Sequence, residues 1–134
     1  MNDNLHAMDD PIHRLLNATE PGTYVQPHRH LTPAKAETLT VIAGRGALVL
    51  FDDTGHVTET AVLSPRGPAF VAEVPAAAWH TLLALEPGTV WFEVKPGPYA
   101  APPPEDVAAW APAPGAPQAA DYLARLVGVA RRAR

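Results

Sequence analysis

The chain has 134 residues, with sixteen prolines, nine glycines, six histidines and no cysteine. This length predicts one domain, and 47% hydrophobic with 18% charged residues is typical of a folded globular chain. Without cysteine there is no disulfide, thiolate zinc site, iron–sulfur cluster or cysteine nucleophile, so any chemistry must use oxygen and imidazole groups.

The charge distribution argues against nucleic acid and membrane partners. The net charge is −4, and residues 1–124 carry six basic against fourteen acidic side chains. A body of this sign repels phosphate backbones, so we expect no nucleic-acid partner. The sequence has no run of 18 apolar residues and no apolar signal core near Met1, so we expect no membrane association and a cytoplasmic location.

The first expected element is a short helix that follows a polar N-terminal arm. Asp9 or Asp10 can serve as the N-cap, and Pro11 suits the first helical position. We expect this helix to end by Asn17, because Glu20–Gly22 includes a proline and a glycine.

From residue 23 the hydrophobic period changes to 2, which is typical of strands. About seven short strands are expected, separated by proline and glycine turns: 23–30, 37–43, 47–52, 57–63, 69–74, 80–85 and 89–94. Short strands at this spacing predict an all-β sandwich, barrel or jelly roll.

Half of the prolines lie between Pro96 and Pro117, a stretch that cannot enter a central strand. We expect an extended wrap over the barrel, anchored by Tyr99 and Trp110, and then a helix over 118–132 with an apolar stripe. The single domain 1–134 would thus comprise an arm with a short helix (1–22), a β-barrel core (23–95), the proline-rich wrap (96–117) and a C-terminal helix (118–132).

Three of the histidines have the spacing of a metal site. His28 and His30 are two apart on an expected strand, so both imidazoles lie on one face. Glu37 begins the next strand, and His80 begins another some fifty residues later. Three imidazoles and one carboxylate suit a single divalent transition metal (Fe, Zn, Mn, Ni, Co or Cu), with positions left for water or substrate.

These residues also resemble the two motifs of the cupin superfamily. The first, G-x5-H-x-H-x3-4-E-x6-G, is matched by Gly22, His28, His30, Glu37 and Gly44, and the second, G-x5-P-x-G-x2-H-x3-N, by Gly67, Pro75, Ala77 and His80. The sequence departs from both. Six residues separate His30 from Glu37, which makes Glu37 the least secure ligand, and Gly67 lies two positions further from Pro75 than the motif has it. Ala84 stands in place of the final asparagine. Because Ala77 replaces the usual glycine, we expect the turn there to avoid positive φ.

A longer resemblance covers nearly the whole chain. The stretches 4–6, 14–16, 24–30, 50–53, 79–80, 92–99 and 110–112 are similar to the WbuC family of cupin-fold metalloproteins. That resemblance implies a cupin double-stranded β-helix (a jelly-roll barrel) with a metal site, and a link to polysaccharide and O-antigen biosynthesis, whereas the activity of the family is not established. By analogy with other cupins we expect a homodimer.

Strand parity extends the site into a pocket. If His28 faces inward, so do Tyr24 and Gln26. Strand 89–94 and the residues after it offer the interior either Glu93 and Lys95 or the apolar residues between them, and inward charges would have to pair. Tyr24, Glu93 and Lys95 are then the candidate proton-transfer groups.

Arg14, Tyr24 and Gln26 are the candidate substrate contacts. Arg14 can meet an anionic substrate or form a surface ion pair. Of the other histidines, His56 is expected in a solvated turn and His13 exposed or capping on the short helix. His6 is expected in the N-terminal arm.

Three functions remain open at this point. The chain is a metal-dependent oxygenase or an isomerase or epimerase acting on a sugar-like or small organic substrate, a non-catalytic module that binds a saccharide or other small ligand, or a barrel with a structural metal.

Overall fold

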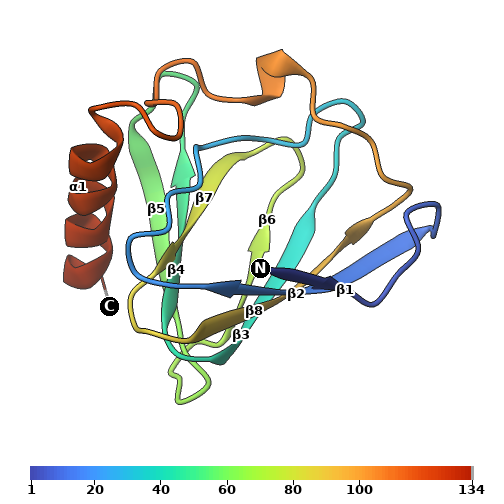
Figure 1. The fold of residues 1–134 in the computed structure, drawn as a ribbon, viewed down its shortest axis with the longest axis horizontal. Coiled ribbons are helices and arrows are strands. Elements are labelled where there is room, and N and C mark those ends of the chain that lie inside the picture. The colour runs from blue at the N-terminus through green and yellow to red at the C-terminus, as the bar shows by residue number, and fades with distance from the viewer. Residues whose placement is uncertain (134) are drawn as a thin grey trace.

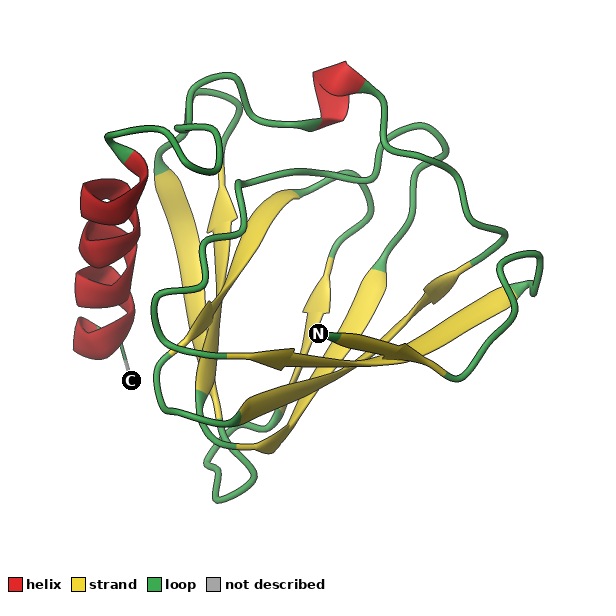
Figure 2. Cartoon of the chain, in the orientation of Figure 1, coloured by secondary structure: helices red, strands yellow, loops and turns green. Residues whose placement is uncertain are grey.

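A computed structural model describes residues 1–133, which form two facing β-sheets, a short 3₁₀ turn and one helix (Figure 2). The five-stranded sheet has the order β1-β2-β8-β3-β6, and the three-stranded sheet has the order β5-β4-β7. All pairings between neighbouring strands are antiparallel. The elements are β1 (Asn2–Asn4), β2 (Ile12–Thr19), β3 (Glu37–Ala43), β4 (Gly46–Phe51), β5 (Val57–Leu63), β6 (Val71–Val74), β7 (Trp79–Ala84), β8 (Thr89–Pro96), η1 (Pro104–Asp106) and α1 (Ala119–Arg132). The strands from β3 onward lie at or within two residues of the expected ranges.

The space between the two sheets holds one apolar cluster. Its buried members come from both sheets: Leu39, Val41, Leu48, Leu63, Val74 and Trp91. Side chains that share a face with these residues on β3, β7 and β8 therefore also point into the interior, since successive strand residues alternate sides. This interior ends in the site described below.

A second cluster lies on the outer face of the three-stranded sheet. Ala47, Val49 and Phe51 of β4 point outward and pack with Leu123 and Leu126 of α1. Because both faces of β4 are covered, its sequence GALVLF is apolar throughout. Figure 1 shows α1 standing alongside β5 and β4.

The expected C-terminal helix is confirmed as α1, which begins after Gln118. Among residues 1–133, no helix has both the length and the apolar character to cross a membrane.

The expected N-terminal helix is wrong, because residues Ile12–Thr19 form β2. All eight residues of β2 pair with β8, and this ladder outweighs the local Asp-Pro start signal. The burial pattern has the period of a strand: His13 and Leu15 are buried, and Ile12 and Arg14 are exposed. His13 is therefore a buried strand residue instead of an exposed helical one.

The expected strand 23–30 is also wrong. The segment is extended but irregular, and its one β-bridge residue is His28, which bridges both His80 and Val107. Figure 1 shows this segment crossing one end of the sheets together with the proline-rich segment 97–118. Of the two expected anchors, Trp110 packs against Phe51 and Trp79, but Tyr99 remains 56% exposed.

Candidate metal centre

His80 and Glu37 lie at one end of the interior between the sheets. His80 shares a face of β7 with Leu82, which packs against the interior cluster, and Glu37 shares a face of β3 with the buried Leu39. Both polar side chains are almost completely buried, at 1% and 5% exposure. Polar groups buried in an apolar interior require hydrogen-bond or ionic partners. We therefore expect other polar side chains close to His80 and Glu37 at this end of the barrel.

The segment that carries His28 and His30 is held from two sides. On one side, the backbone N–H of His28 donates to the His80 carbonyl and the N–H of His80 donates back, at 3.1 and 2.9 Å. On the other side, the N–H of Arg29 donates to the Asp106 carbonyl, and the N–H of Ala108 donates to the Pro27 carbonyl, both at 2.9 Å. The segment thus behaves as a short strand between β7 and residues 106–108, although Pro27 interrupts any regular ladder.

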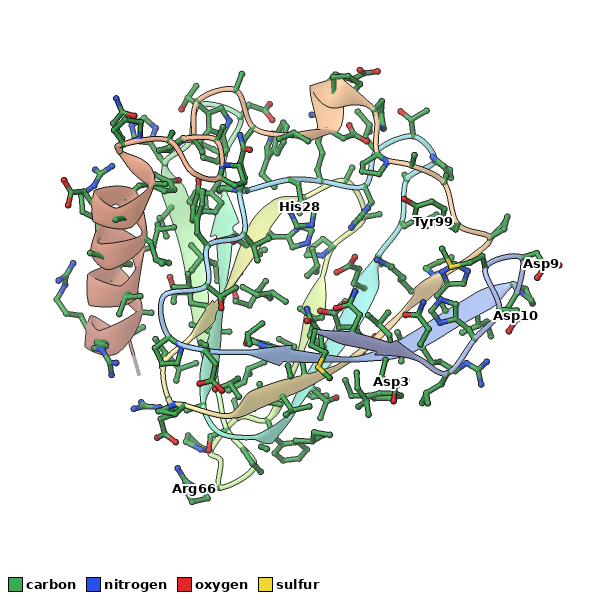
Figure 3. All side chains as sticks on the ribbon, in the orientation of Figure 1. Asp3, Asp9, Asp10, His28, Arg66 and Tyr99 are labelled. Atoms are coloured by element: carbon green, nitrogen blue, oxygen red, sulfur yellow. The ribbon has the colours of Figure 1, made fainter. Side chains whose placement is uncertain are left out.

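The three imidazoles meet at one point. Each of His28, His30 and His80 offers a ring nitrogen, and these atoms all lie within 4.8 Å of one another. The ring centroids of His28 and His80 are 4.4 Å apart, and those of His28 and His30 are 5.3 Å apart. Figure 3 shows His28 reaching from its segment toward the strands.

The outer nitrogens of two rings are already fixed. Nδ1 of His28 lies 3.1 Å from the Gln26 carbonyl, and Nδ1 of His80 lies 3.0 Å from the Ala78 carbonyl. A carbonyl can only accept, so each Nδ1 carries the proton and each Nε2 is left with a lone pair. Backbone carbonyls orient metal-binding histidines in the same way in known sites.

The third histidine has an unsatisfied buried nitrogen. Nε2 of His30 is buried, and although Oε1 of Glu37 lies 2.6 Å away, the two are not aligned as a hydrogen bond. A metal ion would satisfy this nitrogen, and the donor set of three imidazoles suits a divalent transition metal. The residues therefore fit such an ion.

Glu37 contacts two of the three histidines and a lysine. Its carboxylate oxygens lie 2.6 Å from Nε2 of His30 and 3.6 Å from Nε2 of His80, and Nζ of Lys95 lies 3.7 Å from Oε1. Burial raises the pKa of Glu37, but the neighbouring imidazoles and the Lys95 ammonium lower it by more, so the net shift is downward. Glu37 is thus an anion beside the three rings despite its long spacing from His30.

Burial also acts on the other titratable groups of the site. It lowers the pKa of His28 to about 4, and the adjacent His80, which disfavours a second positive charge at the site, lowers it further. The His28 ring is therefore neutral and able to ligate. Glu93 of β8 shares the inward face of Trp91, and burial followed by the charge of Glu37 raises its pKa. Lys95 lies on the same face, so the structure brings Glu93 and Lys95 to the site end of the interior.

A buried ion pair beside the site was missed by the sequence analysis. Nε of Arg29 lies 3.1 Å from Oδ1 of Asp106, and the N–H of Leu31 donates to Oδ2 at 3.2 Å. The Arg29 guanidinium also stacks 4.4 Å from the ring centroid of Trp79, the residue before His80. Asp106 is 1% exposed. Through its two carboxylate oxygens it links the proline-rich segment to Arg29 and Leu31, the residues before and after His30. The Glu105–Asp106 dipeptide in a proline-rich stretch gives no sequence signal of this role.

Tyr24 lies beside α1. Its hydroxyl donates to the Pro112 carbonyl at 2.7 Å, and its ring meets Tyr122 edge-on. Burial raises the pKa of Tyr24 to about 12. Within residues 1–133 no hydrogen bond joins it to the three histidines or Glu37. The expectation that Tyr24 shares an inward face with His28 is wrong, because residues 23–30 do not form a regular strand.

The two remaining candidate substrate contacts are also engaged elsewhere. The Gln26 amide donates to the carbonyls of Ala108 and Ala111 in the proline-rich segment. Arg14 lies on β2 in a surface ion pair with Asp10 at 3.6 Å. Both side chains therefore already have partners in the folded chain, and their contact with a substrate stays a prediction.

The other three histidines lie outside the cluster. His56 is exposed in the turn before β5, paired with Asp52. His6 stacks on the buried His13 with ring centroids 3.9 Å apart, and Nε2 of His13 lies 3.1 Å from the Met8 carbonyl. The stacked pair fastens the N-terminal arm to β2.

The backbone of the turn that leads into β7 is strained at Ala77. Ala77 has φ of 65°, so the expectation that this turn avoids positive φ is wrong. The backbone requires the left-handed conformation that glycine supplies in the cupin motif, and the alanine adopts it at a steric cost of about 1 kcal/mol.

The cavity beside His30 is small. It has a volume of about 20 Å³ and lies between residues 32–35 and 100–103, with Asp106 at its wall. Such a volume holds roughly one water molecule. A substrate that enters through this cavity must therefore be small or must displace these two segments.

Known structures are similar to the chain in fold, whereas comparison of the sequences gives no function. A family model described as a domain of unknown function, DUF6016, matches residues 1–63, and no curated protein matches the chain. The capsular polysaccharide assembling protein CapF from Staphylococcus aureus is similar over 80% of this chain and 30% of its own, with a TM-score of 0.61 and 16% identity. A cupin 2 domain-containing protein from Halorhodospira halophila is similar over 78% of this chain and 70% of its own (TM-score 0.58, 18% identity). KdgF from Halomonas sp. is similar over 74% of this chain and 78% of its own (TM-score 0.56, 20% identity). At these identities the likeness shows a cupin fold.

Proposed function

We propose that this cupin-fold chain binds one divalent transition metal through His28, His30 and His80, with Glu37 as a fourth ligand. The observation that carries the proposal is the convergence of three ring nitrogens within 4.8 Å at the buried end of the barrel. The fixed tautomers of His28 and His80 and the unsatisfied Nε2 of His30 support it.

A metal held by three or four protein ligands supplies Lewis-acid or oxygen-dependent chemistry toward a small molecule in its open positions. Around it, the chain provides two groups on the inward face of β8. Lys95 places an ammonium 3.7 Å from Glu37, where it can hold a negatively charged substrate oxygen or move a proton at Nζ. Glu93 is the second carboxyl that faces the site end and can hold a proton there. Tyr24 is left out of this scheme because its hydroxyl donates to Pro112.

For the substrate we propose an oxygen-rich small molecule of the saccharide class. The resemblance of the sequence to the WbuC family supports this, as does the similar fold of CapF, which is described as a capsular polysaccharide assembling protein. We further propose a single domain, in which the barrel core comprises β2 together with residues 23–95 and is followed by the wrap 96–117 and the helix 118–132. We place this domain in the cytoplasm as a homodimer.

Oxygen uptake and product formation test the catalytic proposal. Protein is loaded with Fe(II) in the absence of oxygen and then mixed, in aerated buffer, with a panel of neutral and acidic sugars and small organic acids. Oxygen uptake and product formation are followed for the wild type and for Lys95→Met as the matched variant. Turnover that needs both the metal and Lys95 supports it. Metal binding with no turnover across the panel contradicts catalysis and favours a binding module.

A structural metal is the alternative that the small cavity beside His30 favours. Thermal melting with and without a chelator distinguishes it, because a metal that binds only the folded chain raises the melting temperature. If the metal is structural, removal lowers the melting temperature strongly and turnover is absent for every substrate. If it is catalytic, turnover disappears on chelation.

A further inference from the structure

A second cavity lies at the opposite end of the barrel from the histidines. It has a volume of about 560 Å³ and lies between β5, the segment 64–69 and the C-terminal end of α1. β4 relates the two sites: its residue Leu50 pairs with His80, whereas Gly46, next to Arg45 of the cavity wall, pairs with Ala84. Four residues of strand separate these positions by about 13 Å. In Figure 3, Arg66 of the segment 64–69 lies at the lower edge of the molecule, and His28 lies in its upper half.

Two arginines line this cavity without a carboxylate partner. Within residues 1–133, neither Arg45 nor Arg131 forms an ion pair, whereas the neighbouring Arg66 pairs with Glu86 at 3.3 Å. Nη2 of Arg131 donates to the Leu85 carbonyl at 3.0 Å, which fixes this side chain at the wall and leaves its other donors available. The two guanidinium groups offset the partial negative charge at the end of α1 and leave the cavity cationic on an otherwise acidic chain.

Two hydroxyls add to the wall. Oγ1 of Thr60 is buried and has no hydrogen-bond partner. A buried hydroxyl without a partner is unfavourable, and a ligand that bonds to it removes that penalty. The Ser64 hydroxyl accepts from the Arg66 N–H at 3.2 Å, and its own hydrogen is free to donate.

We propose that this cavity is a binding site for a small molecule that carries an oxyanion, either a phosphate monoester or a carboxylate. Arg45 and Arg131 bind the anion, since guanidinium donors match the geometry of phosphate and carboxylate oxygens. Thr60 and Ser64 donate to it, and Ala61, Val62, Pro68 and Ala69 contact the rest of the molecule. The volume is within the range of known small-molecule sites.

Calorimetric titration of the full chain tests this site. The probes are inorganic phosphate, glucose 6-phosphate and benzoate, with glucose as the neutral control. We expect saturable binding of at least one anion and none of glucose. Arg45→Gln should weaken that binding at least tenfold and Thr60→Val severalfold, because each removes a contact to the anion. A preference for phosphate or for carboxylate identifies the source of the anion.

Two controls make the result decisive. Arg66→Gln removes a nearby positive charge outside the cavity and should change the affinity less than twofold. His80→Ala removes a histidine at the other end of the barrel and should also leave the affinity unchanged, which separates this site from anion binding to a metal. No saturable anion binding, equal losses in Arg45→Gln and Arg66→Gln, or loss in His80→Ala would overturn the proposal. None of these outcomes depends on whether the metal proposal holds.

Discussion

The two chain segments that supply the histidines reach the same point by different means. His80 lies on β7, a regular strand that pairs with β4 along its whole length. His28 and His30 lie on a segment with no regular strand, which is held by β7 on one side and residues 106–108 on the other. His80 is therefore held by a regular strand ladder, whereas His28 and His30 are held by a few backbone bonds and side-chain contacts. Substitution of those side chains should displace His28 and His30 before it displaces His80.

The largest effect on stability is expected from Asp106→Asn, which breaks the buried pair with Arg29. An amide cannot neutralise the guanidinium, so we expect a loss of about 2–4 kcal/mol in the free energy of unfolding, measured with urea. Metal affinity should also fall about 10- to 100-fold, although Asp106 contacts none of the three imidazoles. An unchanged metal affinity would contradict the role of this pair in positioning the histidines.

A smaller effect is expected from Thr81→Val, which removes a single hydrogen bond between β7 and the residues just before His28. The Thr81 hydroxyl donates to the Val25 carbonyl at 2.6 Å, just before the histidine-bearing segment. The change removes the partner of that half-buried carbonyl, so we expect a loss of about 1–2 kcal/mol on urea unfolding. A loss as large as that of Asp106→Asn would mean that β7, and not the proline-rich segment, holds the histidine-bearing segment.

Ala77→Gly should change stability slightly and in the opposite direction. Glycine adopts φ of 65° without the steric cost that alanine has, although it also increases the entropy of the unfolded chain. We expect a gain of up to about 1 kcal/mol and no change in metal affinity, since β7 is fixed by β4. A loss of stability would show that the turn is not strained.

The smallest effect concerns the Asp52–His56 turn between β4 and β5. Hydrogen bonds from the His56 N–H and then the Thr54 hydroxyl lower the pKa of Asp52 to about 2. Because the folded pKa is below the unfolded value, this contribution to stability is present above pH 4 and is lost as the pH falls through 2. An NMR titration of the carboxyl carbon should show this low pKa in the wild type. A value near 4 would contradict the turn geometry.

Local sequence patterns predict most strands of the barrel but neither β2 nor the contacts that hold the histidine-bearing segment. The strands β3 and β5 lie where the period of 2 placed them, since each has one face toward the interior. β2 was mistaken for a helix because its partner β8 is far away in the sequence. The three histidines converge as their spacing predicted, even though residues 23–30 are not a strand, because backbone bonds on both sides keep His28 extended. No local pattern reveals that Asp106 meets Arg29.

A metal titration of chelator-treated protein tests most directly whether the three histidines bind a metal, with calorimetry for Zn(II) and absorbance for Co(II) as the readouts. We expect one tight site per chain. His28→Ala and His80→Ala should each lower the affinity more than 100-fold, and the matched variant His56→Ala, which changes an exposed histidine outside the cluster, should leave it unchanged. Absence of a stoichiometric site, or equal affinity in His80→Ala and His56→Ala, would contradict it.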